Sequence, residues 1–86
     1  SLIINLKLVV KNQIWILKEL SDIIYNMWIN VDSINTNKIW NLQTEINLGL
    51  IILDYDYLII DRFIDRIKLH FKDLLLSSEV WKIIKQ

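Results

Sequence analysis

Several residue types are rare or missing in this chain of 86 residues: cysteine, proline and alanine are absent, and glycine occurs once. Without cysteine the chain forms neither disulfides nor thiolate metal sites, and its compartment stays open, although a reducing one such as the cytoplasm would suit it. Isoleucine and asparagine are abundant instead, a bias typical of an A+T-rich source or of a designed sequence. Because isoleucine is β-branched, local propensity argues weakly against helix, and the hydrophobic pattern has to decide the fold.

An excess of one charge and long apolar runs are missing too. Ten Lys and Arg residues balance ten Asp and Glu residues, so no long-range field attracts phosphate backbones or anionic membranes, and nucleic acid is disfavoured as a partner. The longest uninterrupted apolar run covers residues 50–53, whereas a spanning helix needs about 20 residues. We therefore expect no transmembrane segment, and the N-terminus does not resemble a signal peptide.

Apolar residues are plentiful for so short a chain. Hydrophobic residues make up 53% of the sequence, yet a single domain of this size buries only roughly 60 to 65% of the surface that its unfolded chain exposes. Some apolar side chains must stay exposed or be covered by another chain. The first functional inference is therefore a protein partner or a homodimer.

The hydrophobic spacing of the first third predicts a long amphipathic helix over residues 2–30. A competing interpretation takes the alternating residues of this segment as a strand that ends in a turn at residues 11–13, which would give an α+β fold with an N-terminal hairpin. The alternating residues are Ile4, Leu6, Leu8 and Val10. Residues 31–37, rich in Asn, Asp, Ser and Thr, predict a loop.

The second half shows a heptad pattern, in which apolar residues alternate in steps of four and three from Ile46 to Leu74. Ser77, Ser78 and Glu79 resemble a helix cap that opens a short terminal helix. We therefore expect an all-α protein: a helical hairpin or a three- to four-helix bundle. If the second half is one continuous helix, dimerisation would complete a four-helix bundle.

Two carboxylates, Asp54 and Asp56, interrupt this apolar run. In a continuous helix Asp56 would point into the apolar face, where an unpaired carboxylate costs several kcal/mol. Three explanations stay open: a helix break with an aspartate as cap, an ion pair with another helix or subunit, or a functional site. Acidic caps are common, so the break is favoured.

Candidate chemistry is sparse. The sole histidine, His70, has Asp73 one turn later and could act as an acid or base, although an ordinary boundary histidine is favoured. Arg62 and Arg66 could bind a dianionic ligand in a cleft, although a solvated charged face is favoured. Together with Asp56, these residues are the catalytic candidates. We expect no metal site and no cofactor.

The tryptophans carry more information. Trp28 and Trp81 are expected in the core, whereas Trp15 and Trp40 fall off the main apolar face of the expected helices. Exposed tryptophan is enriched among interface anchors. The partner-binding candidates are Ile4, Leu8, Trp15 and Trp40. The sequence thus predicts a non-enzymatic helical interaction module of the adaptor, inhibitor or scaffold type, with a small helical-bundle enzyme or a peripheral membrane protein as alternatives.

Overall fold

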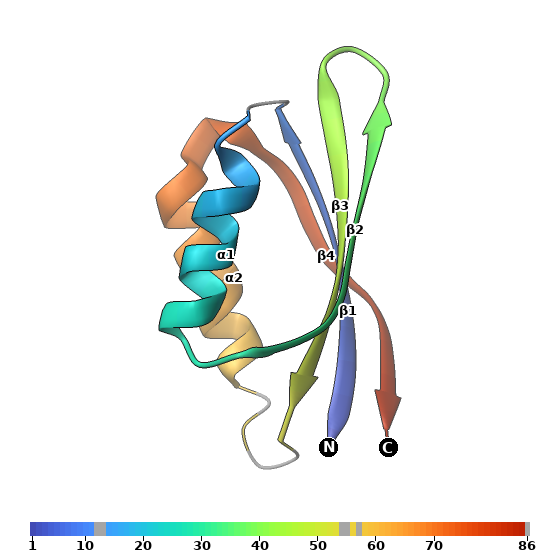
Figure 1. Cartoon of the computed structure of the whole chain (residues 1–86), viewed down its shortest axis with the longest axis vertical. Coiled ribbons are helices and arrows are strands. Elements are labelled where there is room, and N and C mark those ends of the chain that lie inside the picture. Colours follow the sequence, from blue (N-terminus) through green and yellow to red (C-terminus); the bar gives the residue numbers. More distant parts are fainter. Residues whose placement is uncertain (12–13, 54–55, 57, 86) are drawn as a thin grey trace.

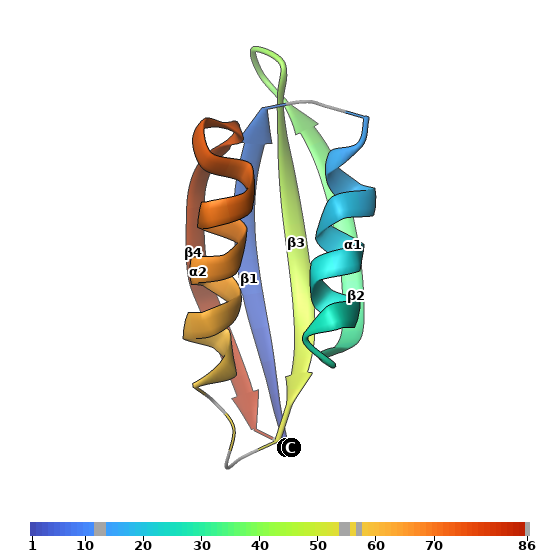
Figure 2. The same cartoon turned by 90° about the vertical axis from the view of Figure 1, so that its left-hand side faces the viewer.

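The computed structural model describes residues 1–11, 14–53, 56 and 58–85 and has an α+β architecture. The elements in chain order are β1 (Leu2–Lys11), α1 (Ile16–Asn26), β2 (Asn30–Ile39), β3 (Gln43–Ile52), α2 (Ile59–Phe71), the 3-10 turn η2 (Lys72–Leu74) and β4 (Leu75–Lys85). The four strands form one antiparallel sheet in the order β2-β3-β1-β4. Both helices cover the same face of this sheet (Figures 1 and 2).

The all-α expectation is wrong, and so are its helical hairpin and four-helix bundle. Residues 2–11 form a strand, residues 31–37 lie inside β2 instead of in a loop, and the expected terminal helix is β4. The competing interpretation of residues 4–10 as a strand is correct, but α1 follows that strand where a hairpin was expected. The physical reason is that a spacing of four residues is even, so it places side chains on one face of a strand as well as on one face of a helix.

Two shorter segments with helical spacing of their apolar residues do form helices. The buried residues of α1 are Ile16, Leu20, Ile23 and Ile24, and those of α2 are Ile60, Phe63, Ile67 and Phe71. Steps of three occur in both sets, and a step of three is incompatible with one face of a strand. Both helices therefore present an apolar stripe to the sheet.

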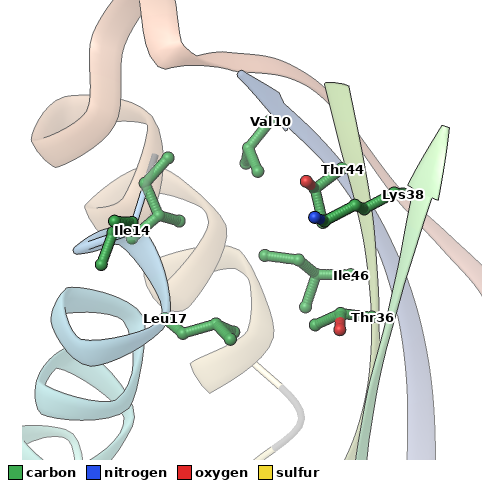
Figure 3. A pocket seen from close by; sticks show the side chains of 8 residues that line it. Val10, Ile14, Leu17, Thr36, Lys38, Thr44 and Ile46 are labelled. Carbon is green, nitrogen blue, oxygen red and sulfur yellow. The ribbon is translucent and has the colours of Figure 1, made fainter. Parts of the chain in front are cut away.

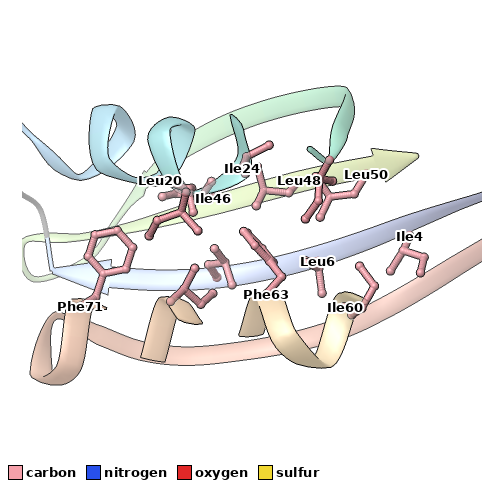
Figure 4. Close-up of a cluster of buried hydrophobic side chains, with 14 of the residues drawn as sticks. Ile4, Leu6, Leu20, Ile24, Ile46, Leu48, Leu50, Ile60, Phe63 and Phe71 are labelled. Atoms are coloured by element: carbon pink, nitrogen blue, oxygen red, sulfur yellow. The ribbon is translucent and has the colours of Figure 1, made fainter. Parts of the chain in front are cut away.

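The core lies between the two helices and the inner face of β1 and β3 (Figure 4). From β1 it receives Ile4, Leu6, Leu8 and Val10, and from β3 it receives Ile46, Leu48, Leu50 and Ile52. The register pairs three residues of each set directly: Ile4 with Leu50, Leu6 with Leu48, and Leu8 with Ile46. Full burial of one such side chain contributes about 1.5 to 3 kcal/mol, so the central strands hold much of the stability.

The chain leaves β3 through the acidic segment that the sequence singled out. Asp54 lies outside the described residues. The backbone N–H of Asp56 donates to the Leu53 carbonyl at 2.9 Å. Leu58 is the N-cap of α2 and makes no side-chain cap bond, so Asp56 is not the cap of this helix. The continuous helix is wrong, because a connection separates β3 from α2 here.

Candidate interaction surface

In the part of the chain that the structure describes, the outer strands β2 and β4 each have one edge that pairs with no other strand. The β4 edge is irregular, because two register shifts interrupt its pairing with β1. In β2 the single shift lies between Val31 and Ser33, so residues 33–39 form a regular edge. Bulges protect an edge strand from pairing with another chain, whereas a long regular edge is open to it.

Two hollows flank β2 on the helix face of the sheet. We call the first the Ile14 groove; it has a volume of about 190 Å³ and lies between the start of α1 and the end of β2 (Figure 3). Its lining residues are Val10, Ile14, Ile16, Leu17, Thr36, Lys38, Thr44 and Ile46. We call the second the Tyr25 groove; it has a volume of about 480 Å³ and is lined by Ser21, Ile24, Tyr25, Ile29, Val31 and Ile34.

These grooves carry uncovered apolar side chains. Ile14 is fully exposed, and Leu17, Val31 and Ile34 each keep more than two fifths of their surface accessible. Tyr25 is 82% exposed. Apolar side chains gathered beside a regular strand edge are typical of a surface that another protein covers.

Trp28 ends α1 in an unusual way. The N–H of Ile29 donates to the Ile24 carbonyl, and the N–H of Trp28 donates to the Tyr25 carbonyl. This pair of bonds forms a Schellman motif, whose left-handed position usually holds glycine. Trp28 occupies that position with φ of 59° and is 93% exposed, so its expected place in the core is wrong.

The predicted partner-binding residues lie in three different places. Ile4 and Leu8 are buried under the helices, so their side chains are covered by the chain itself and are not available to a partner. Trp15 is 43% exposed and stacks on Phe71 with ring centroids 6.3 Å apart. Trp40 is 88% exposed in the turn between β2 and β3.

The catalytic candidates do not converge on one site. Arg62 and Arg66 are exposed on α2, and Asp56 precedes that helix. His70 Nε2 lies 3.4 Å from the Glu19 carboxylate of α1 and forms an ion pair only when it is protonated. None of these four candidates lines either groove beside β2. Among the described residues, no group of three or more His, Asp or Glu could hold a metal ion.

The outer sheet face carries a polar network centred on Glu45. The side-chain amide of Asn47 donates to the Glu45 carboxylate at 3.2 Å, and Lys7 Nζ lies 3.7 Å from it. The hydrogen bond from Asn47 is the main cause of a lowered pKa of Glu45, and Asn37 and Lys7 lower it further, against the opposing effect of desolvation. The network keeps Glu45 ionised. Beside it, Trp81 is half exposed on β4, where the expected core position is wrong, and Lys7 Nζ lies 6.0 Å from its ring centroid.

Sequence reasoning missed the residues that flank β2. Trp28 was assigned to the core, while Ile14, Tyr25 and Ile34 were not singled out. A signal was present in β2: Ile34 and Thr36 alternate with Asn35 and Asn37. The prediction of a loop gave more weight to the turn preference of asparagine than to the strand propensity of the alternating residues.

Comparisons with known proteins identify the fold alone. The chain is similar to the ACT domain of a GTP pyrophosphokinase from Chlorobium tepidum, with a TM-score of 0.69 and 15% identity over 92% of this chain and 96% of that one. It is also similar to the C-terminal domain of the MgtC protein from Mycobacterium tuberculosis (TM-score 0.73, 8% identity, 93% and 85% coverage). The de novo designed protein Foldit4 matches with a TM-score of 0.64 and 19% identity over 99% and 97% of the two chains.

A larger enzyme contains the same architecture as one of its parts. A formyltetrahydrofolate deformylase from Pseudomonas putida matches over 98% of this chain but only 29% of its own length, with a TM-score of 0.71 and 8% identity. No family model and no curated protein matches the sequence. The chain therefore has an α+β fold like that of the ACT domain, with one antiparallel sheet and two helices. Neither described helix has the length and hydropathy to cross a membrane.

Proposed function

We propose that the chain is a non-enzymatic association domain that pairs with a second copy of itself along β2. The observation that carries the proposal is the regular, unpaired edge of residues 33–39, together with the half-exposed side chains of Val31 just before it and Ile34 within it. Pairing of two such edges would satisfy the hydrogen-bonding capacity of their backbone groups. It would also join the four-stranded sheets of the two copies into one continuous sheet. We thus retain the homodimer predicted from composition, but its interface is a sheet edge and not a helical bundle.

The charges of β2 favour antiparallel pairing. Its only charged side chains are Asp32 near its start and Lys38 near its end. Antiparallel pairing brings opposite charges to the same end of the seam, whereas parallel pairing would bring like charges together. The register that places Asp32 opposite the second copy's Lys38 sets Asn35 opposite itself. This register also keeps the helices of both copies on one face of the joint sheet.

The similar structures supply a context for such a domain. Two are described as domains of named proteins, an ACT domain and a C-terminal domain, and the deformylase contains the fold within a longer chain. We propose that this chain likewise serves as an accessory domain whose pairing joins larger assemblies. A small enzyme and a peripheral membrane protein stay alternatives, and the scattered positions of Arg62, Arg66 and His70 do not favour the enzyme.

A single engineered thiol tests the pairing, because the chain has no cysteine of its own. Directly opposite residues of antiparallel strands have Cα atoms about 4.5 to 5.5 Å apart, within the range that a disulfide spans. Asn35→Cys should therefore form a covalent dimer under mild oxidation. Ser77→Cys is the matched control, since Ser77 is an exposed polar residue on the other edge strand.

Sedimentation equilibrium of the unmodified chain completes the test. We expect a reversible dimer, with rapid oxidation of Asn35→Cys and slow oxidation of Ser77→Cys. A chain that sediments as a monomer at every concentration would contradict the proposal. A covalent dimer formed by Ser77→Cys alone would contradict it as well, because it would place the contact on β4.

A further inference from the structure

We infer that Trp28 of each copy fills the Ile14 groove of the other copy. The inference rests on the proposed pairing along β2 and adds to it a side-chain contact that determines its strength. The partner is a second copy of this chain, and the contact occurs twice across the two-fold axis.

The topology brings these two features together. Trp28 lies two residues before Asn30, where β2 begins, whereas the Ile14 groove lies along the end of β2, at Thr36 and Lys38. Antiparallel pairing places the start of one strand beside the end of the other. With Asn35 opposite itself, Asn30 of one copy lies opposite Trp40 of the other. Trp28 therefore reaches the end of the seam at which the partner's groove opens.

Both features are uncovered in the single chain. The indole of Trp28 is almost fully exposed, and the outer wall of the groove includes Ile14, which is fully exposed, and Leu17. Figure 3 shows Leu17 facing the strands across the hollow, with Thr36 and Lys38 on the opposite side. Insertion of a tryptophan would remove apolar surface of both copies from water, and the aliphatic stem and ammonium of Lys38 suit the face of an indole.

The backbone at Trp28 prepares this side chain for insertion. Two capping hydrogen bonds hold the residue in a left-handed conformation at the end of α1, so the direction of its Cα–Cβ bond is fixed before a partner arrives. A rigid aromatic side chain loses little conformational entropy on binding, which is the property of an interface anchor. Trp28 is both strained and exposed in the single chain, and both properties are explained if its side chain makes its main contact in the dimer.

A stable dimer needs more surface than a single strand edge provides. A standard interface takes about 800 Å² from each partner, roughly a seventh of the 5877 Å² that this chain exposes. A single strand edge supplies only a part of that area. The grooves and Trp28 add apolar surface to the contact at both ends of β2.

Dimer dissociation constants of matched variants test the inference. Trp28→Gly and Trp28→Ala should each weaken the dimer by well over 30-fold, because one interface hot spot is worth roughly 30-fold and each substitution removes the contact from both copies. Trp81→Ala is the control, because it removes a half-exposed tryptophan from the outer sheet face at β4 and should change the constant less than twofold. Circular dichroism of each variant verifies that the α+β fold is retained.

A double-mutant cycle with the groove identifies the contact itself. Ile14→Ser should also weaken the dimer, and its effect should be strongly non-additive with that of Trp28→Gly, because two residues in contact share their coupling energy. Additive effects would overturn the contact between Trp28 and the groove.

The two proposals fail in different ways. If Asn35→Cys cross-links while Trp28→Gly leaves the dissociation constant unchanged, the pairing along β2 stands and the anchoring role of Trp28 is refuted. If the unmodified chain is a monomer, both are refuted. If Trp81→Ala weakens the dimer as much as Trp28→Gly does, the contact lies elsewhere and the inference fails.

Discussion

Glycine at position 28 should stabilise the folded chain relative to alanine, which is the reverse of their order inside a helix. Trp28 has φ of 59°, a conformation that costs an L-residue about 1 to 2 kcal/mol and costs glycine nothing in steric terms. Glycine loses about 0.5 to 1 kcal/mol more backbone entropy on folding. Trp28→Gly should therefore exceed Trp28→Ala in unfolding free energy by about 0.5 to 1 kcal/mol.

The comparison of glycine with alanine isolates the backbone, because both variants lose the same indole. That loss is itself small: with 93% of Trp28 exposed, only roughly 20 Å² of burial disappears, about 0.5 kcal/mol. The assay is urea unfolding followed by circular dichroism, at concentrations where sedimentation shows a monomer. In thermal unfolding the difference between the two variants corresponds to roughly 3 to 6 °C.

A second pair of variants supplies the control for this comparison. Tyr25 is 82% exposed and lies within α1, so Tyr25→Gly should be less stable than Tyr25→Ala by about 1 kcal/mol. The reasoning predicts opposite signs at positions 25 and 28. If alanine were favoured at both positions, α1 would continue through Trp28 and the Schellman motif would be refuted.

Three further outcomes follow from the packing and the charges. Gly49→Ala should destabilise the chain by about 1 kcal/mol, since the added Cβ would lie 2.7 Å from Ser33 Oγ. In a double-mutant cycle of unfolding free energies, Ser33→Ala should remove most of this cost. An unchanged cost would contradict the clash. Leu8→Ala should lower the unfolding free energy by about 2 to 5 kcal/mol, because Leu8 is 1% exposed; loss of dimer affinity without loss of stability would return Leu8 to the interface. The lowered pKa of Glu45 means that its ionised form stabilises the folded state above its ordinary value of 4.5 and that this contribution is lost as the pH falls through the lower folded-state pKa. Asn47→Ala should raise that pKa in an NMR titration, and an unchanged value would refute the hydrogen bond as its cause.

The fold was predictable in part, and the errors have one physical source. Ile4, Leu6 and Leu8 show it most clearly: at 100° per residue Ile4 and Leu8 fall opposite Leu6, whereas in a strand all three share one face. The helical interpretation therefore turned two core residues into partner-binding candidates. In α2 the steps of three from Ile64 to Ile67 and from Ile60 to Phe63 admit a helix and exclude one strand face, and there the prediction of a helix is correct.

The candidate surface was predictable to a smaller extent. Composition predicted that apolar side chains would stay uncovered, and the exposed Trp40 was expected on sequence grounds. The exposure of Trp28 was not expected. A left-handed residue at a helix end is normally recognised by glycine, and hydrophobic periodicity does not reveal it when another residue occupies that position. Leu42 and Lys72 also have positive φ, and no glycine at these positions marks the turns in the sequence.

Sequence by itself determined the neutral net charge, the absence of cysteine and an apolar content higher than so short a chain can bury. Local spacing also determined most of the buried stripes of α1 and α2, although the fully buried Phe63 falls outside the heptad pattern. Only the tertiary structure decided that β1 pairs with both β3 and β4, and therefore that β2 is an edge. Those pairings join residues that are distant in sequence, such as Leu2 with Ile52 and with Lys85. Hydrogen bonds between distant segments follow from how the whole chain buries its apolar faces, and a local pattern does not contain that information.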